Sequence, residues 1–353
     1  MEQKKVILSV RDLCVNFRVR GRELRAIRGV SVDFYENESV AIVGESGSGK
    51  SVFTKTFSGM LETNGHISRG QILFRDGEKT VDLAQLHHSR QWDQLRGGRI
   101  ATVFQDPMTS LDPVVPIGKQ ITAVIRKHQN CSAAEARLRA LTMMQKVGIS
   151  DPEKRFDDYP FQYSGGMRQR IVIAIALSCQ PKILICDEPT TALDVTIQAQ
   201  ILKLIKDLQK EFGFTIVFVT HDLGVVANIA DRVAVLYAGQ IVELGTAEEI
   251  FYDPCHPYTW ALLSSLPQLA KRDTELYCIA GTPPSLYSQI KGDAFAPRNP
   301  YCLKIDTLQE APVFKVTDTH WAKTWLLDPR APKVEKPEAI QNLHQRLARR
   351  NVR

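Results

Sequence analysis

The chain has 353 residues, of which 44% are hydrophobic and 24% are charged, and its formal net charge is +6. This length suits one large domain with an extension, or two domains, and the composition is ordinary for a soluble globular protein. The modest positive charge is compatible with nucleic acid, an anionic membrane surface or no charged partner, so composition alone does not choose among them.

No segment indicates a membrane span or a disulfide framework. The longest apolar run near the middle of the chain covers residues 171–179, which is far short of the roughly 20 residues that a spanning helix needs. The first ten residues lack the apolar core of a signal peptide. The 7 cysteines include no C-x-x-C pair, and this odd number favours free thiols in a reducing cytoplasm. We therefore expect any membrane attachment to come through a partner.

The first segment is predicted to form two strands, residues 6–17 and 27–34, around a charged turn at 18–25. Phe17 ends the first of these strands. Its ring has the right chemistry to stack on an adenine, but an aromatic side chain at a strand end equally often serves packing. The position of Phe17 leaves both interpretations open.

The stretch from residue 39 to residue 51 carries the clearest functional pattern. Residues 39–43 are apolar and β-branched, as in a buried strand. The next eight residues, Gly44-Glu45-Ser46-Gly47-Ser48-Gly49-Lys50-Ser51, fit the phosphate-binding sequence G-x-x-x-x-G-K-[ST]. Glycines let backbone N–H groups converge on a phosphate, Lys50 reaches the β- and γ-phosphates, and the Ser51 hydroxyl can ligate Mg²⁺. The flanking apolar strand and helix favour a nucleotide site over an unspecialised glycine-rich turn.

Polar side chains end three further predicted strands. Gln105 follows the strand at 100–104 and can ligate Mg²⁺ or hold a water, although a surface glutamine is the simpler interpretation. Asp187 and Glu188 end the apolar segment that starts at residue 182. In phosphate-loop NTPases such acids orient Mg²⁺ and accept a proton from water, but a solvated acidic pair is the alternative. His221 follows the strand at 215–220 and is either structural or placed near a γ-phosphate.

The region from the end of the loop 106–113 to about Cys179 is predicted to be mostly helical. Ser132 and Glu135 have the spacing of a capping box, followed by a predicted apolar stripe of Leu138, Leu141, Met144 and Val147. Ser164, Gly165 and Gly166 open a second apolar helix and form either an anion-binding terminus or an ordinary cap. Before this region, the turn-rich loop 106–113 is expected to expose Met108 and Leu111 as a hinge or partner contact.

The order and spacing of these motifs resemble those in the ATPase subunits of ABC transporters. The ordered set consists of the phosphate loop, Gln105, Ser164-Gly165-Gly166, the acidic strand end, Ala192-Leu193-Asp194 and His221. Each motif is weak to moderate alone, but the set is specific and covers about residues 6–250. The resemblance implies an α/β P-loop NTPase fold with an ATP-binding domain over 1–250. This domain would contain a RecA-like core, an antiparallel β-subdomain and an inserted helical subdomain at about 108–178, followed by an extension over 251–353.

The resemblance also implies roles for individual residues. The implied catalytic residues are Glu188, which would polarise the attacking water, and His221, which would position it. Mg²⁺ would be served by Ser51, Gln105 and, through water, Asp187. The ATP-binding residues implied are Phe17, Gly44, Glu45, Ser46, Gly47, Ser48, Gly49, Lys50, Ser51, Gln105, Ser164, Gly165, Gly166, Met167 and Asp194. Ser164, Gly165 and Gly166 would act on the ATP of a second ATPase subunit, and Asp194 would link the two sites.

Finer features resemble the oligopeptide/dipeptide importer branch, and most of all its oligopeptide-permease D-type subunits from Gram-positive bacteria. They are the loop 106–113, the run 161–170, and three segments near the C-terminus, 256–259, 281–284 and 292–298. This branch implies a second, homologous ATPase subunit, two membrane permease subunits and an external peptide-binding protein, with the chain at the cytoplasmic face of the membrane. The Pro-rich extension is expected to pack through Trp260, Trp321 and Trp325, with residues 337–353 as a basic helix or, preferably, a solvated tail.

Two positions depart from the family pattern. Many ABC ATPases have Leu-Ser-Gly-Gly-Gln as the signature, whereas this chain has Tyr163-Ser164-Gly165-Gly166-Met167. The phosphate-contacting residues remain, so we expect the signature to function. Some relatives hold an iron–sulfur cluster on four cysteines, but here Asp293 and Asn299 replace two of these and leave Cys278 and Cys302. We therefore expect ATP and Mg²⁺ as cofactors but no cluster in this chain.

Two rival functions are compatible with parts of the sequence. A soluble ABC ATPase acting on nucleic acid or ribosomes would suit the net charge of +6 and the basic C-terminus, but the chain has one ATPase domain and no coiled-coil or zinc insertion. A non-catalytic regulatory subunit is disfavoured because Glu188 and His221 are both present. We therefore expect peptide import and no nucleic-acid partner.

Overall fold

The structure is a computed structural model that describes residues 4–86, 88–191, 193–266, 279–338 and 340–341. The sequence predictions that concern Ala192, Cys278 and most of segment 337–353 lie outside these residues. Within the described part of the chain, no helix combines the length and the apolar character that crossing a membrane requires.

Eight strands of the described chain form a central sheet in the order β11-β12-β10-β9-β3-β8-β7-β6. Strand β3 lies between β8 and β9, parallel to both, and all of its residues are buried. A strand covered on both faces is apolar throughout, which is why the sequence predicts β3 and β8 correctly. The bounds are β3 Ser39–Val43, β6 Ile100–Val103, β7 Ile183–Asp187, β8 Thr215–Thr220, β9 Arg232–Tyr237, β10 Gln240–Thr246, β11 Phe314–Lys315 and β12 Trp321–Ala322.

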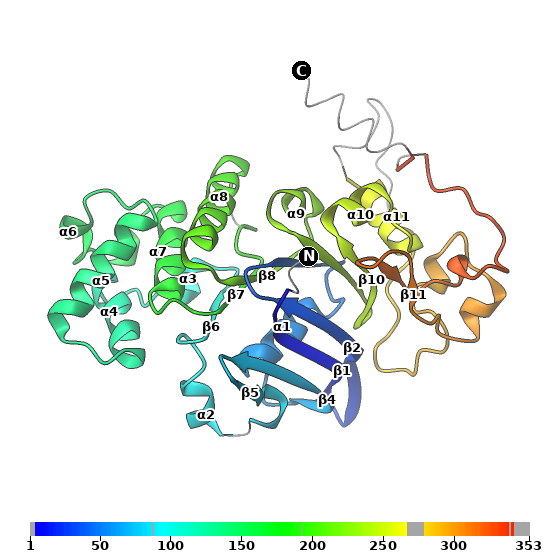
Figure 1. Cartoon of the computed structure of the whole chain (residues 1–353), viewed down its shortest axis with the longest axis horizontal. Coiled ribbons are helices and arrows are strands. Elements are labelled where there is room, and N and C mark those ends of the chain that lie inside the picture. The colour runs from blue at the N-terminus through cyan, green and yellow to red at the C-terminus, as the bar shows by residue number, and fades with distance from the viewer. Residues whose placement is uncertain (1–3, 87, 192, 267–278, 339, 342–353) are drawn as a thin grey trace, which may run out of the picture.

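A second, antiparallel sheet in the order β2-β1-β4-β5 packs against the central one through a shared apolar core (Figure 1). Its bounds are β1 Val6–Val19, β2 Arg22–Tyr35, β4 Gly65–Asp76 and β5 Lys79–Asp82. The predicted pairing of the first two strands is confirmed, because β1 and β2 form an antiparallel ladder. Phe17 pairs with Leu24 in this ladder and is 9% exposed.

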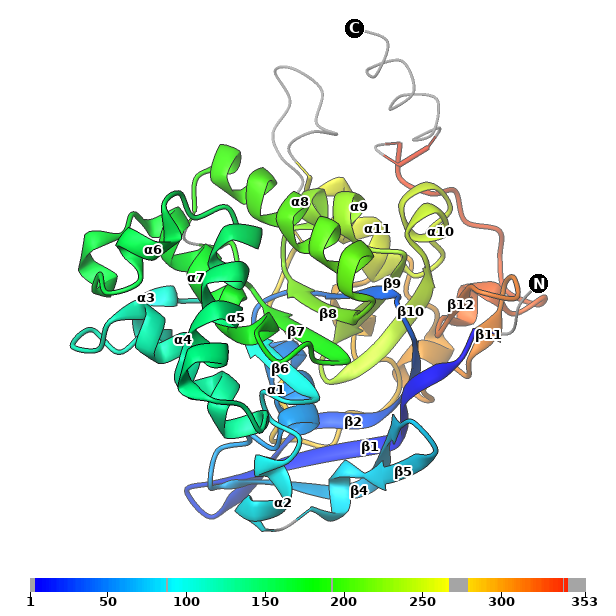
Figure 2. The same ribbon diagram turned by 60° about the vertical axis from the view of Figure 1, so that its left-hand side comes forward.

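Helices cover both faces of the central sheet and form a separate group at one end. In Figure 2, α8 and α9 lie over one face, whereas α1 and the small sheet lie over the other. Helices α3 to α7 gather at one end (Figure 1). The bounds are α1 Lys50–Ser58, α2 Ser89–Asp93, α3 Pro107–Ser110, α4 Ile117–His128, α5 Ala133–Lys146, α6 Pro152–Arg155, α7 Gly165–Leu177, α8 Val195–Phe212, α9 Leu223–Ile229, α10 Ala247–Tyr252 and α11 Pro257–Ser264. Short 3-10 turns span Leu83–Gln85, Pro160–Gln162, Ala296–Arg298, Lys304–Thr307 and Trp325–Leu327.

Two predictions about the helical region are wrong. Leu138, expected in the buried stripe of α5, is 66% exposed, because α5 buries the face that carries Ala136, Ala140, Met143 and Met144. Leu111, expected at the surface, is 4% exposed and belongs to the main core cluster. By contrast, Met108 is 59% exposed, as predicted. The capping box is confirmed, since Glu135 N donates to Ser132 Oγ at 3.2 Å and Ser132 N donates to Glu135 Oε2 at 2.8 Å.

The C-terminal extension continues the central sheet instead of forming a separate body. Strand β12 pairs antiparallel with β10, and β11 pairs with β12 (Figure 1). The buried carboxylate of Glu243 on β10 reinforces this edge, because its Oε1 lies 2.8 Å from His320 Nε2. The predicted packing of Trp260 is confirmed at 4% exposure. Trp321 also packs, partly buried, against the core shared by both sheets.

Candidate nucleotide site

The loop between β3 and α1 packs against the end of β9 and the start of β2 so closely that two of its positions require glycine. Gly44 has φ 153°, and a Cβ there would lie 2.1 Å from the Leu236 carbonyl oxygen. Gly49 has φ 105°, and its Cβ would lie 2.9 Å from the Ala26 carbonyl oxygen. The N–H groups at the start of α1 are left without a partner inside the helix, and they suit an anion.

Lys50 lies buried at the mouth of this loop. Its Nζ donates to the carbonyl oxygens of Gly44 at 2.9 Å and Glu45 at 3.0 Å. Burial lowers the pKa of Lys50, and the negative charges of Glu188 and Asp187 act in the opposite direction. The ammonium is therefore held by neutral carbonyls that phosphate oxygens can replace with a gain in Coulomb energy.

The backbone N–H of Glu45 has a partner within the protein. It donates to the Tyr258 hydroxyl at 2.8 Å, and the Ser48 N–H donates to the Glu45 carbonyl oxygen at 3.2 Å. These contacts help to hold the loop in place, and the roles of the loop amides toward phosphate stay a prediction.

A hydroxyl and a carboxylate meet beside the start of α1. Ser51 Oγ donates to Asp187 Oδ1 at 2.9 Å. Burial raises the pKa of Asp187, and the charge of neighbouring Glu188 raises it further. The Ser51 hydroxyl and the Asp187 carboxylate are hard oxygen ligands, and neighbouring groups do not fully balance the negative charge of the carboxylate. Such a pair fits Mg²⁺. Gln105, the third predicted ligand, is exposed two residues after the end of β6.

Glu188 occupies a strained backbone position at the end of β7. Its φ is 47°, a left-handed conformation that is costly for a residue with a Cβ. Its carboxylate has two partners, since Oε1 lies 3.1 Å from His221 Nδ1 and Oε2 accepts from Thr191 Oγ1 at 3.1 Å. The structure thus brings Glu188 and His221 together. Sequence reasoning missed Thr191, whose only signal is its place three residues after Glu188.

The signature residues begin a different pair of helices. Ser164 caps α7 by accepting from Met167 N at 3.4 Å, and Asp194 caps α8 by accepting from Ile197 N at 2.9 Å. The two helix starts adjoin, because a Cβ on Gly166 would lie 3.0 Å from Ile197 Cγ2. Among the described residues, no hydrogen bond or ion pair joins 164–167 to the loop at 44–51. The described residues therefore show no direct polar contact between the two predicted halves of the ATP site within one chain.

Comparison with known families identifies two regions of the chain. Residues 27–191 match the ABC transporter family, and residues 242–305 match the C-terminal region of oligopeptide/dipeptide transporters. The chain is 64% identical over 346 residues to the oligopeptide transport ATP-binding protein AmiE of Streptococcus pneumoniae, an alignment that covers 98% of this chain and 96% of that protein. It is 55% identical to the oligopeptide transport ATP-binding protein OppD of Bacillus subtilis, over 97% of this chain and 95% of that protein.

Solved structures agree with this assignment. A dimeric structure of the ATP-binding cassette MJ0796, bound to ADP and Pi, has 27% sequence identity and a TM-score of 0.59, covering 68% of this chain and 98% of that one. CbiO1 from Clostridium perfringens, part of an ABC transporter complex, has 30% identity and a TM-score of 0.60, covering 70% and 92% of the two chains. The chain therefore belongs to the family of ATP-binding subunits of oligopeptide and dipeptide ABC transporters.

Proposed function

We propose that the chain is the ATP-hydrolysing subunit of an ABC importer that takes up oligopeptides. The observation that carries this function is the convergence of Lys50, Ser51, Asp187, Glu188 and His221 at the ends of β3, β7 and β8. The oligopeptide transport proteins at 64% and 55% identity support the substrate class. An ATP-binding domain over 1–250, with a helical subdomain at about 108–178, and an importer-type extension over 251–353 fit the two family matches.

ATP is proposed to lie between two ATPase subunits arranged head to tail. The phosphate loop of one subunit would face Ser164, Gly165, Gly166 and Met167 of the other, and Asp194 would link the two sites. In support, these signature residues make no hydrogen bond or ion pair with their own phosphate loop among the described residues, and the similar cassette MJ0796 is dimeric. We infer that the second subunit is a homologous ATPase of a different sequence.

Within each site the residues divide the work of phosphoryl transfer. Lys50 and the amides of the loop Gly44–Gly49 would bind phosphate, and Ser51, Gln105 and, through water, Asp187 would hold Mg²⁺. Bound Mg²⁺ neutralises charge that develops on the phosphate oxygens. Glu188 would polarise the attacking water with His221 positioning it, which their 3.1 Å contact supports. Phe17 remains a prediction as the adenine-stacking residue, since its ring is mostly buried in the small sheet.

The surface beside α3 is proposed to receive a helix of a permease subunit. A cavity of about 510 Å³ opens there, lined by Phe104, Thr109 and Ser110 together with Val172 and Ile175 of α7. An apolar-floored groove next to the site is suited to helix-in-groove binding. We infer two permease subunits, an external peptide-binding protein and a location at the cytoplasmic face of the membrane.

Other functions are less well supported. A soluble ATPase acting on nucleic acid or ribosomes has the net charge of +6 in its favour, but the relatives described above are transport proteins. A non-catalytic regulatory subunit is disfavoured because Glu188 already has both His221 and Thr191 as hydrogen-bonding partners.

Replacing the proposed base should separate binding from hydrolysis. Glu188→Gln keeps the size of the side chain but loses the proton acceptor, so we expect ATP binding to persist while turnover falls about a hundredfold or more. Lys50→Ala should abolish ATP binding. Nucleotide binding and phosphate release are to be measured on both variants. Hydrolysis by Glu188→Gln at the parent rate would show that Glu188 is not the base.

Met108→Asp should uncouple ATP hydrolysis from peptide uptake. The side chain is 59% exposed, so a charge there should spare folding and basal hydrolysis while disrupting an apolar contact with the permease. Leu111→Asp is the matched comparison, because it places a charge in the core and should lower the thermal stability of the protein instead. Unimpaired uptake of labelled peptide by the Met108 variant would contradict the docking proposal.

Asp187→Asn should stabilise the nucleotide-free protein at pH 8. Burial raises the pKa of Asp187 in the folded state, so the folded protein holds its proton more tightly than the unfolded chain does. The parent protein then gains stability relative to the variant as pH falls through the folded-state pKa. We expect the variant to unfold about 2 °C or more higher at pH 8, with a difference that shrinks as pH falls through the folded-state pKa of Asp187. Unfolding temperatures measured across a pH series down to pH 4 check this, and a difference that stays constant over the whole series would exclude the Asp187 charge as its source.

We infer that this chain holds no iron–sulfur cluster. Such a cluster would supply neither ATP binding nor hydrolysis. Asp293 Oδ1 accepts from Phe295 N at 2.9 Å, and Asn299 Oδ1 accepts from Tyr301 N at 2.9 Å. Both side chains serve as turn caps and neither supplies a thiolate. Protein purified without oxygen should contain no stoichiometric iron or acid-labile sulfide, and finding four of each per chain would overturn the inference.

A further inference from the structure

The C-terminal extension reaches the phosphate loop through one buried arginine. Arg298 is 253 positions away from Glu45, yet its Nη1 donates to Glu45 Oε2 at 2.6 Å and its Nη2 donates to Oε1 at 2.9 Å. The side chain of Arg298 is only 4% exposed. A two-pronged contact of this kind fixes direction as well as distance.

The remaining donors of Arg298 are also engaged. Its Nε donates to the Ala280 carbonyl oxygen at 2.9 Å, and Nη1 contacts the Tyr237 hydroxyl at 3.3 Å. Arg298 thus joins three segments: the loop after β3, the end of β9 and the extension near residue 280. Its guanidinium is oriented before any nucleotide binds.

The same loop residue is held a second time through its backbone. Tyr258 of α11 is fully buried, and its hydroxyl accepts from Glu45 N at 2.8 Å. The Tyr258 ring lies 4.4 Å from the Tyr237 ring and 5.3 Å from the Phe295 ring. The side-chain carboxylate and the backbone N–H of Glu45 are therefore both bound by residues that follow the ATP-binding domain in the sequence.

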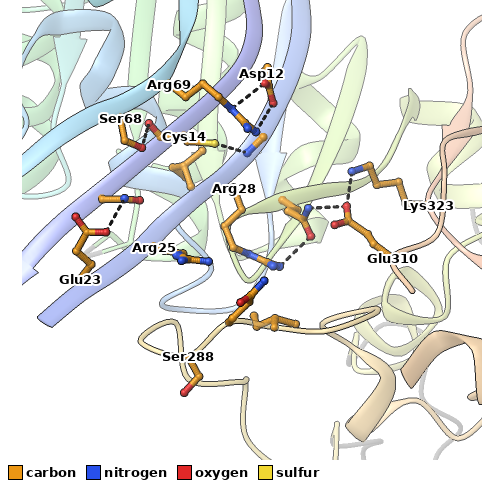
Figure 3. A pocket seen from close by; sticks show the side chains of 16 residues that line it. Asp12, Cys14, Glu23, Arg25, Arg28, Ser68, Arg69, Ser288, Glu310 and Lys323 are labelled. Atoms are coloured by element: carbon orange, nitrogen blue, oxygen red, sulfur yellow. Dashed lines mark hydrogen bonds and ion pairs between the residues drawn. The ribbon is translucent and has the colours of Figure 1, made fainter. Parts of the chain in front are cut away.

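The extension also meets the small sheet, where Arg25 N donates to the Leu286 carbonyl oxygen at 3.0 Å. Figure 3 shows a polar cavity between them, lined by Arg25 and Arg28 of β2 and by Ser288 of the extension. Its volume is about 580 Å³. On its far side Glu310 accepts from Lys323 Nζ at 2.9 Å and from Gln240 Nε2 at 2.7 Å. Beside this cavity, the extension binds the phosphate loop through hydrogen bonds to Glu45.

We propose that Arg298 and Tyr258 are positioning residues that hold the phosphate loop in its ATP-binding conformation through Glu45. The Glu45 carbonyl also accepts from Lys50 Nζ at 3.0 Å, so Glu45 connects the extension to the phosphate-binding ammonium. When Lys50 turns to the phosphates, this carbonyl contact is lost, and the Arg298 pair keeps the loop from relaxing. The inference rests on the proposed ATP-binding function of the loop.

The test measures equilibrium binding of ATP with Mg²⁺ to the full chain. Arg298→Ala should weaken ATP binding about tenfold, corresponding to the loss of one charged hydrogen-bonded pair. Arg298→Lys keeps the charge but loses the second prong, so it should give an intermediate affinity. In the assembled transporter, the KM for ATP should rise while kcat at saturating ATP changes less than about twofold.

A double-mutant cycle shows whether Arg298 acts through Glu45. Adding Arg298→Ala to Glu45→Ala should cause no further loss of affinity, because the pair is already broken. Glu45→Gln approaches the same contact from the loop side and should also weaken binding, so the test does not depend on one variant. Arg330→Ala is the matched control: it breaks an arginine–aspartate pair with Asp328 elsewhere in the extension and should leave ATP affinity unchanged.

The outcomes distinguish this inference from the proposed function. Parent-like affinity of Arg298→Ala, an equal loss in the Glu45→Ala background, or an equal loss in Arg330→Ala would overturn the positioning role. Failure of the parent chain itself to bind ATP would instead overturn the proposed function of the loop.

Discussion

The site depends on how closely the phosphate loop packs at the end of the central sheet. Gly44 lies so near the Leu236 carbonyl oxygen that any side chain there would collide with it. Strands β3, β7 and β8 are parallel neighbours, so the residues that follow them emerge at one edge. The phosphate loop, the Asp187–Glu188 pair and His221 meet there for this topological reason, although they are far apart in the sequence.

Much of this arrangement could be predicted because buried parallel strands have nearly continuous apolar sequences. Residues 39–43 and 215–220 are such runs; the first leads into the glycine-rich phosphate loop and the second into His221. The capping box at Ser132 could also be predicted, since it depends on local spacing alone. The burial of single apolar residues was harder to predict: Leu138 in α5 and Leu111 just after α3 are both apolar, but only tertiary packing decides that the first is exposed and the second is buried.

The polar contacts between the extension and the phosphate loop could not be predicted from the sequence. Nothing local to Glu45 indicates that Arg298 and Tyr258 bind its carboxylate and its amide. Strands β11 and β12 have only two residues each, too few for a periodic pattern, and they exist because β10 offers an edge. The extension is therefore best understood as part of the ATPase, attached to its sheet and to its phosphate loop.

In the proposed arrangement ATP lies between two ATPase subunits, and the chain acts together with membrane permease subunits. The direct measurement is to isolate the tagged full-length chain from its native membranes and identify what co-purifies by mass spectrometry. The account predicts a second, similar ATPase and two polytopic membrane proteins in comparable amounts. Ribosomal proteins or nucleic acid, with no membrane protein present, would contradict it.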